Sequence, residues 1–266
     1  MPVHSTSPCN NFEALFLFKS SASFENKVKI MANIHSFESM AALDGVGIRY
    51  DVFFTGCHLR CVYCHNPDTW FKSDINMTAE EVFKKARRFK PYFKNGGGVT
   101  FSGGEPLLNS DFINEISPML KSEGIGYCLD TSGSVPLTES VKKAIDNSDM
   151  VILDIKFYTP EDYKKYTGGD FDRFMSIGKY CTEIDKRMWL RTVIVPGIND
   201  TKEDIEKYAN LVKDFKFEKY ELLGFHTLGF FKYENLKIDN PLAETKALDK
   251  SKLDELQKHL DKSFCQ

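Results

Sequence analysis

Short apolar runs alternate with amphipathic segments along most of the chain. The apolar runs are rich in β-branched, aromatic and aliphatic residues, which is typical of buried strands. They span residues 48–54, 98–101, 127–130, 150–155, 188–195 and 220–223. The segments between them carry apolar residues at helical spacing and predict helices over residues 78–89, 111–122, 137–146, 200–215 and 251–260. The first of these helices opens with Thr78-Ala79-Glu80-Glu81, a capping box that satisfies free amides of the first turn.

This alternation with short connections indicates an all-parallel sheet covered by helices. About six strand–helix units are fewer than the eight of a closed barrel. The pattern by itself is compatible with an open partial barrel or with a doubly wound sheet. The connection over residues 56–76 is long for such a fold, and long loops in compact domains are usually functional.

Charge and length narrow the function classes. The chain has 266 residues, with 35 Lys and Arg against 38 Asp and Glu, so its net charge is −3. Nucleic-acid binders usually carry a basic excess, so no nucleic-acid partner is expected. No stretch approaches the ~20 apolar residues of a membrane-spanning helix, and no membrane association is expected. We expect residues 31–266 to form one domain, monomeric and cytoplasmic, in a reducing compartment that keeps cysteines available as metal ligands.

The first 30 residues differ from the rest of the chain. They are rich in serine, and no arginine occurs before Arg49. We predict that residues 1–30 are a disordered extension. Organelle targeting is an alternative, although transit peptides are rich in arginine. A third interpretation is that translation starts at Met31.

Three of the seven cysteines lie close together in the long loop, at Cys57, Cys61 and Cys64. Three thiolates within eight residues can converge on one inorganic centre. A structural zinc ion would need a fourth ligand, which His58 or His65 could supply. Three ligands without a fourth would instead leave one iron of a four-iron cluster open to a substrate.

The spacing of these cysteines, C-x3-C-x2-C with Tyr63 before the last one, resembles the signature of the radical S-adenosylmethionine superfamily. One helix further on, residues 102–106 read Ser-Gly-Gly-Glu-Pro and resemble the GGE motif of that superfamily. Alone, two glycines at a strand end would fit a tight turn equally well. The resemblance implies a [4Fe–4S] cluster on the three cysteines and S-adenosylmethionine bound to its unique iron.

Polar residues end the third and fourth predicted strands, where side chains of parallel sheets face the pocket. They are Asp130 and Thr131 on one strand and Asp154 and Lys156 on the other. Geometry alone allows a simple ion pair between Asp154 and Lys156, since side chains two apart on a strand share a face. The segments Cys-Leu-Asp-Thr and Leu-Asp-Ile-Lys that contain them resemble one branch of the superfamily, the activases of glycyl radical enzymes.

Five more segments resemble the same branch, at residues 34–39, 44–49, 64–70, 189–197 and 222–229. The branch implies a partial (β/α)6 barrel of the TIM type. It also implies a monovalent cation held by Asp130, Thr131 and Asp154. A lone histidine such as His226 is more often structural, but the resemblance gives it contact with the adenosyl group. We interpret Glu105 as holding its turn.

The resemblance assigns a role to each candidate residue. The catalytic candidates are Cys57, Cys61, Cys64, Lys156 and His226. The cofactor-binding candidates are Tyr63, Cys64, His65, Gly103, Gly104, Glu105, Asp130, Asp154, Ile155, Lys156 and His226. The candidates for gripping the glycine loop of a partner are Asp44, Asn66 and Arg191.

The branch also implies partners. These are pyruvate formate-lyase as the protein substrate and flavodoxin or ferredoxin as the electron donor. Several other activases carry a cysteine-rich insert after the first cluster, but no cysteine occurs here between Cys64 and Cys128. Val46 and Gly224 stand where the branch usually has proline. An activase of another glycyl radical enzyme and a non-redox zinc-binding barrel remain as alternatives.

Overall fold

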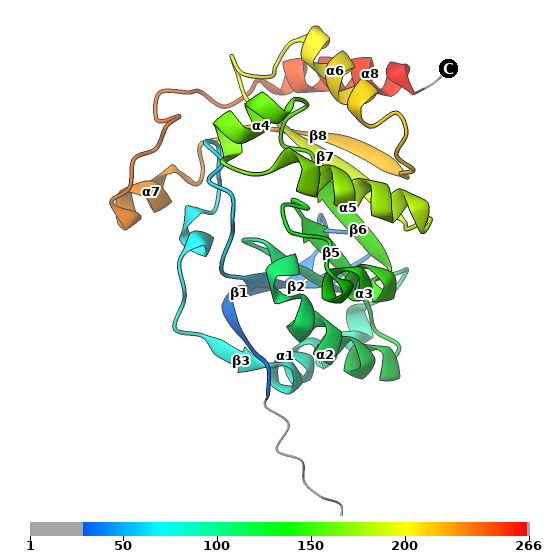
Figure 1. The fold of residues 1–266 in the computed structure, drawn as a ribbon. Helices are drawn as coiled ribbons and strands as arrows, with labels where there is room; N and C mark the ends of the chain where they lie inside the picture. Colours follow the sequence, from blue (N-terminus) through cyan, green and yellow to red (C-terminus); the bar gives the residue numbers. More distant parts are fainter. Residues whose placement is uncertain (1–28, 265–266) are drawn as a thin grey trace, which may run out of the picture.

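The computed structural model of the chain describes residues 29–264 as one sheet with helices packed against it (Figure 1). The strands are β1 Met31–Ala41, β2 Arg49–Phe54, β3 Asn76–Thr78, β4 Gly98–Gly103, β5 Gly126–Thr131, β6 Met150–Asp154, β7 Met188–Ile194 and β8 Lys219–Gly224. The α-helices are α1 Ala79–Arg87, α2 Ser110–Ser122, α3 Glu139–Asn147, α4 Pro160–Thr167, α5 Phe171–Glu183, α6 Lys202–Leu211, α7 Phe230–Leu236 and α8 Lys250–Ser263. Short 3-10 helices are η1 Pro67–Trp70, η2 Lys90–Tyr92 and η3 Pro106–Asn109.

The sheet confirms the partial barrel. Its order is β3-β1-β2-β4-β5-β6-β7-β8. Six of these strands are parallel and follow one another in chain order, namely β2, β4, β5, β6, β7 and β8. In a doubly wound sheet the order in which parallel strands are added reverses at a switch point. The parallel strands of this sheet are added in one direction throughout. Six parallel strands therefore wind in one direction without closing into a ring.

The prediction of an all-parallel sheet is wrong for β1 and β3. β1 is antiparallel to β2, and β3 is antiparallel to β1. A parallel pairing needs a crossover connection of a dozen or more residues. The link between β1 and β2 is shorter and turns back at Gly45 and Gly47, both of which have positive φ. The short link leaves only the antiparallel arrangement.

The predicted helices all exist, with ends shifted by a few residues. Thr78 caps α1 as expected, because its hydroxyl accepts from the Glu81 amide while the Glu81 carboxylate accepts from the Thr78 amide. Three helices were missed, namely α4, α5 and α7. A signal for α4 was present, since Thr159 caps it and Pro160 occupies its first turn, an arrangement that favours helix initiation.

The main core lies between the outer face of the sheet and the helices. Phe54 of β2 stacks on Phe101 of β4 with ring centroids 5.8 Å apart and meets the edge of Phe112 of α2 at 5.7 Å. Burial of each such side chain contributes about 1.5–3 kcal/mol. The alternate residues of the same strands therefore face the inside of the barrel, where the polar groups gather.

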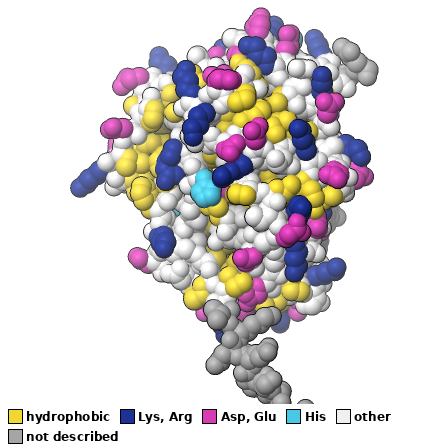
Figure 2. Space-filling model, in the orientation of Figure 1, with side chains coloured by type: hydrophobic (Ala, Val, Ile, Leu, Met, Phe, Trp, Pro, Cys, Tyr) yellow, Lys and Arg dark blue, Asp and Glu magenta, His cyan; other side chains and the backbone are white. Residues whose placement is uncertain are grey.

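Charges of both signs are scattered over the face of the molecule in Figure 2, without a large patch of one sign. No helix within residues 29–264 is both long and apolar enough to cross a membrane. The proposed extension, residues 1–30, lies outside the described residues except for its last two positions, and Cys9 and Cys265 lie outside them as well.

Candidate functional site

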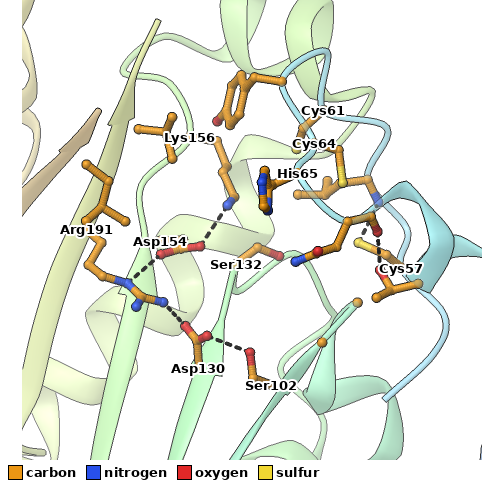
Figure 3. A pocket seen from close by; sticks show the side chains of 18 of the residues that line it. Cys57, Cys61, Cys64, His65, Ser102, Asp130, Ser132, Asp154, Lys156 and Arg191 are labelled. Atoms are coloured by element: carbon orange, nitrogen blue, oxygen red, sulfur yellow. Dashed lines mark hydrogen bonds and ion pairs between the residues drawn. The ribbon is translucent and has the colours of Figure 1, made fainter. Parts of the chain in front are cut away.

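A cavity of about 310 Å³ opens at the C-terminal ends of the parallel strands. Figure 3 shows the cysteine loop on one wall and charged side chains from β5, β6 and β7 on the other. The predicted site residues that line this cavity are Cys57, Cys61, Tyr63, Cys64, His65, Asn66, Gly103, Gly104, Asp130, Thr131, Asp154, Lys156, Arg191 and His226. Residues from six different segments of the chain therefore meet at one place.

The cysteine loop is fastened by elements that come much later in the chain. The Arg60 amide donates to the Thr167 carbonyl at 2.7 Å, and the Val62 amide donates to the Tyr166 carbonyl at 2.9 Å. On the other side, the Tyr233 hydroxyl of α7 donates to the Cys64 carbonyl at 2.8 Å. Helices α4 and α7 thus hold the loop in the shape that turns its thiols toward the cavity.

The three thiols suit a polynuclear cluster. Cys57, Cys61 and Cys64 are free and line the same cavity. Within residues 29–264, however, no three His, Cys, Asp or Glu side chains converge closely enough to share a single ion. A tetrahedral zinc site needs such convergence, whereas a four-iron cluster binds each thiolate at a different iron. Of the two histidines considered as a fourth zinc ligand, His58 is exposed and does not line the cavity.

Burial keeps these cysteines protonated until a metal binds. It raises the pKa of Cys57 to about 11 and that of Cys61 to about 12. Thiolates are the form that ligates metal, so incorporation of iron must release protons here. The low-dielectric surroundings that disfavour a free thiolate also shield a cluster from water.

The loop after β4 contacts the cysteine loop backbone to backbone. The Glu105 amide donates to the Gly56 carbonyl at 2.9 Å, and the Gly104 amide donates to the Phe54 carbonyl at 2.9 Å. A Cβ atom at Gly104 would lie 2.1 Å from the Gly56 carbonyl oxygen. Glycine is therefore required at this position by close packing, independently of any ligand.

Glu105 holds two loops together. Its carboxylate is completely buried and accepts from the Thr131 hydroxyl at 2.5 Å, the Ser132 amide at 3.0 Å and the Ser132 hydroxyl at 2.6 Å, at the end of β5 and in the loop that follows it. It also accepts from the Leu107 amide at 3.0 Å. The geometry agrees with the turn-holding interpretation, and Glu105 does not line the cavity.

Arg191 of β7 is the centre of an ionic network inside the barrel. Its guanidinium contacts three carboxylates, with Nη1 3.1 Å from Asp44, Nε 3.2 Å from Asp154, and Nη2 hydrogen-bonded to Asp130. Lys156 Nζ lies 2.8 Å from the other oxygen of Asp154. Figure 3 shows the chain of contacts from Lys156 to Asp130. The simple ion pair between Asp154 and Lys156 therefore exists, as one part of a larger network.

The network shifts the pKa values of Asp130 and Asp154 in opposite directions. Burial raises the pKa of Asp130 to about 6, against the attraction of Arg191. Burial also acts to raise the pKa of Asp154, but Lys156 and Arg191 together outweigh it and hold that pKa below its usual value. Burial alone would lower the pKa of Lys156, whereas Asp154 and Cys61 raise it. Lys156 is therefore a cation, not a base, at neutral pH.

His65 and His226 form a pair at the rim of the cavity. Their ring centroids are 4.2 Å apart at 72°. Burial and the neighbouring His226 lower the pKa of His65. Beside them, Lys232 of α7 donates to the Asn66 side-chain oxygen at 2.6 Å. Two flat rings and an anchored amide thus border the opening.

Three predicted site residues do not line the cavity, namely Glu105, Ile155 and Asp44. Asp44 nevertheless joins the network through Arg191. Sequence reasoning gave no role to two hydroxyls that do line it, Ser102 and Ser132. Ser102 donates to Asp130 Oδ2 at 2.6 Å. The signal for both was available, because each lies at the C-terminal end of a predicted strand.

Comparison with known proteins agrees with this geometry. The model of the radical SAM superfamily matches residues 52–212. A pyruvate formate-lyase-activating enzyme of Clostridium pasteurianum is 47% identical over 234 residues, which cover 87% of this chain and 98% of that protein. One from Streptococcus mutans is 40% identical over 227 residues, covering 82% and 86%.

Comparison with solved structures supports the assignment of the fold. A radical SAM methyltransferase from Sphaerobacter thermophilus superposes with a TM-score of 0.60 over 87% of this chain and 75% of that one, at 15% identity. At this identity the likeness concerns the fold alone, whereas the sequence relatives cover nearly the whole described chain. The chain therefore belongs to the radical S-adenosylmethionine superfamily of enzymes and, within it, to the family of pyruvate formate-lyase-activating enzymes.

Proposed function

We propose that this chain activates pyruvate formate-lyase in anaerobic metabolism by forming a glycyl radical on it. Family membership implies a [4Fe–4S] cluster and S-adenosylmethionine as cofactors. Together they supply one reaction: one electron cleaves the sulfonium carbon–sulfur bond to give methionine and a 5′-deoxyadenosyl radical, which takes a hydrogen atom from a backbone glycine of the partner.

The observation that carries the proposal is the composition of a single cavity. Three thiols line one side, and Asp154 with Lys156 line the other, with the backbone of Gly104 between strand and loop. Three cysteine ligands leave one iron of a four-iron cluster free for a substrate. S-Adenosylmethionine carries an amino group, a carboxylate, a ribose and an adenine, and the cavity presents groups that complement each.

Each part of the cofactor has a candidate partner. The backbone carbonyls near Gly104 would accept from the methionine amino group, and Lys156 would balance the carboxylate. Asp154 would accept from a ribose hydroxyl. The rings of His65 and His226 would contact the adenine, since a flat imidazole stacks on a flat base.

The opposite end of the network suits the protein substrate. Asp44 and Arg191 there, together with Asn66 at the opening of the cavity, are the candidates for gripping the glycine loop through its amides and carbonyls. Arg191 now lies between Asp130 and Asp154, two of the proposed ligands of a monovalent cation. We propose that a cation bound there frees the guanidinium for the partner, because both cannot neutralise the same carboxylates.

The shape of the site also serves to protect the reaction. A carbon radical must meet only its target, so water and other side chains have to be excluded. The inside of the barrel provides this protection, because Arg191 and Asp130 are only 11% and 13% exposed. The substrate glycine must leave its own protein to reach this depth, which makes activation a coupled rearrangement of two proteins.

The decisive experiment is anaerobic activation. Iron-loaded protein, S-adenosylmethionine and purified pyruvate formate-lyase are mixed with a reductant, and the glycyl radical is followed by electron paramagnetic resonance. Reduced flavodoxin and reduced ferredoxin are compared with dithionite as electron donors. We expect a radical on pyruvate formate-lyase and 5′-deoxyadenosine in solution.

Two other results would change the conclusion. If S-adenosylmethionine is cleaved but the radical forms only on a different glycyl radical enzyme, that enzyme is the partner of this chain instead of pyruvate formate-lyase. A colourless protein that contains stoichiometric zinc and no iron after anaerobic purification would contradict radical chemistry and favour the zinc-binding alternative.

A further inference from the structure

Asp51 of β2 is a carboxyl group inside the barrel that the proposed chemistry does not use. It is completely buried, and neither of its oxygens meets a hydrogen-bond donor among the described residues. It lies on the inner face of β2, because the alternate residues Tyr50 and Val52 belong to the core under the helices and successive side chains point to opposite faces. A buried carboxylate without a donor is costly.

The nearest cation does not pair with Asp51. Arg49, two positions earlier on the same face, directs its donors elsewhere: Nε to the Thr100 hydroxyl at 2.9 Å, Nη1 to the carbonyls of Val46 at 3.3 Å and Gly96 at 3.0 Å, and Nη2 to the Val99 carbonyl. Arg49 therefore ties β2 to β4 and leaves Asp51 without an ion pair.

The group that Asp51 does meet is another acid. Asp51 lies beside Thr100 across the β2–β4 pairing, and the Thr100 hydroxyl donates to the Asp44 carbonyl, so the carboxyl of Asp44 is the acid closest along this side of the barrel and acts on Asp51. Asp44 is held from two further sides, since its carbonyl accepts from the Thr100 hydroxyl at 2.7 Å and its carboxylate faces Arg191 at 3.1 Å. Two carboxyl groups in contact cannot both be ionised, so one of them must keep a proton.

We propose that Asp51 is a positioning residue, a neutral carboxylic acid that donates a hydrogen bond to the Asp44 carboxylate and aims it at the substrate side of the Arg191 network. The proton belongs on Asp51 in this arrangement, because Arg191 contacts the Asp44 carboxylate directly, whereas no cation of residues 29–264 forms an ion pair or hydrogen bond with Asp51. This inference rests on the proposed role of Asp44 in gripping the glycine loop. It adds a residue that touches neither the cofactor nor the partner.

The surroundings of Asp51 favour the neutral form. Burial raises its pKa to about 8, and the charges of Asp44 and Asp130 act in the same direction, whereas Arg49 opposes them. From β5, the Cys128 thiol has a pKa raised to about 11 and is uncharged at neutral pH. Across the β1–β2 pairing, Glu38 lies opposite Asp51 but is exposed.

A direct test measures the protonation state by infrared spectroscopy. The difference spectrum between the natural chain and Asp51→Asn should show the carbonyl band of a protonated acid at pH 7, and the band should fade as the pH rises past about 8. The exposed Glu38→Gln is the matched control and should leave the band in place. Absence of the band at pH 7 would overturn the proposal, including the case in which a bound monovalent cation replaces the proton.

A kinetic test separates positioning from general damage. It uses iron-loaded protein, a peptide that contains the target glycine of pyruvate formate-lyase, and parallel measurement of 5′-deoxyadenosine without peptide. Asp51→Asn retains a donor and should bind the peptide normally at pH 7. Asp51→Leu retains the shape but not the donor, and its KM for the peptide should rise roughly tenfold, with cleavage of S-adenosylmethionine unchanged.

The pH profile supplies the last discrimination. In the natural chain the peptide KM should rise above pH 8 as Asp51 ionises and repels Asp44, whereas Asp51→Asn should have a flat profile. Equal KM values for the natural chain and Asp51→Leu would contradict positioning by Asp51. If the natural chain fails to cleave S-adenosylmethionine, the proposed function fails, and the infrared band still decides the carboxyl pair.

Discussion

Arg191 neutralises buried carboxylates inside the barrel. It is 11% exposed and contacts Asp44, Asp130 and Asp154. Removal of one partner from a buried ionic group leaves uncompensated charge, which is much more costly than the net worth of the pair. The guanidinium therefore stabilises the fold as well as the site.

We expect Arg191→Met to lower the free energy of unfolding at pH 7 by about 3–5 kcal/mol. In the natural chain Arg191 helps to hold the pKa of Asp154 down, so Asp154 stabilises the fold at neutral pH. Without Arg191 the folded-state pKa values of Asp130 and Asp154 rise, and protonation relieves the repulsion as the pH falls.

Thermal unfolding at several pH values checks this prediction. The difference in Tm between Arg191→Met and the natural chain should be larger at pH 7 than at pH 5. Arg187→Met serves as control, because Arg187, directly before the same strand, forms an exposed ion pair with Glu218, and such pairs contribute little. A Tm difference for Arg191→Met that does not depend on pH would contradict the electrostatic account.

Cys61 should be indispensable for the metal centre. It is the most buried of the three cavity cysteines, and Cys61→Ala removes one of only three thiolate ligands. We expect loss of the broad absorbance near ~400 nm from thiolate–iron charge transfer, together with loss of glycyl radical formation. Iron content and visible spectra of anaerobically reconstituted protein provide the measurement.

Cys181→Ala is the matched control for Cys61→Ala. Cys181 is a buried, free cysteine of α5 that does not line the cavity. This variant should retain the natural iron content and visible spectrum. Activity that survives in Cys61→Ala would argue against a cluster on these three cysteines.

At the scale of elements, the site depends on contacts between loops. The loop after β4 bonds to the cysteine loop through backbone groups, and Glu105 joins it to the loop after β5. All of these contacts are made in loops or by the last residue of a strand, not within a strand or helix. Exact spacing of the loops, rather than propensity, determines where the thiols and the carboxylates lie.

Gly104→Ala should disturb this arrangement at one point. The new Cβ would lie 2.1 Å from the Gly56 carbonyl oxygen, so the two loops must separate. We expect a lower Tm by several degrees, about 1–3 kcal/mol of overpacking strain, and weaker retention of iron. Circular dichroism melts and iron analysis provide the measurement.

Gly124→Ala distinguishes a clash from a general effect of adding a methyl group. A Cβ at Gly124 meets no atom within 4 Å, and its φ of +66° carries only the left-handed penalty, about 1–2 kcal/mol. It should destabilise the fold without loss of iron. Equal loss of iron in both variants would contradict the loop-contact argument.

The element scale also shows where sequence patterns were insufficient. The six parallel strands were predicted because they are continuous apolar runs, and apolar runs reflect burial directly. β1 was missed because its residues alternate between buried and exposed only near its start. Its direction was not readable from its residues, since pairing depends on the length of the link to β2. α4 was missed because its apolar residues are few. For α5 a signal was present, since Phe174, Ile177 and Cys181 recur at helical spacing after the cap Asp170.

At the scale of the whole molecule, binding of S-adenosylmethionine should stabilise the fold. The cavity joins groups from β4, β5, β6, β7 and the cysteine loop, so its ligand must bind the folded chain and not the unfolded one. At a concentration of one hundred times Kd the gain is about 2.7 kcal/mol, which corresponds to a rise in Tm of several degrees for a chain of this size.

This prediction also depends on the metal centre. Iron-loaded protein should show the full rise in Tm with S-adenosylmethionine, and Cys61→Ala should show little, because a vacant iron position is needed for chelation. S-Adenosylhomocysteine, which lacks the sulfonium charge, serves as the comparison ligand. A full rise in Cys61→Ala would show that the cofactor binds independently of the cluster.

The sequence alone determined the family and with it the chemistry that we propose. Cysteine spacing, strand-end acids and the glycine-rich loop are local features, and local features can be recognised in the sequence without knowledge of the fold. It also determined the parallel core, because burial on both faces of a strand requires a continuous apolar run.

Only the tertiary structure decided which groups meet. Asp44 and Arg191 are 147 positions apart and in contact. The residues around each of them give no indication of this contact. The same holds for Asp51, which in the sequence is one polar residue in a strand, whereas in the structure it is completely buried and meets no donor among the described residues. Protonation states and ionic partners depend on distances across the barrel and on exclusion of water, and both arise only when all the strands are in place.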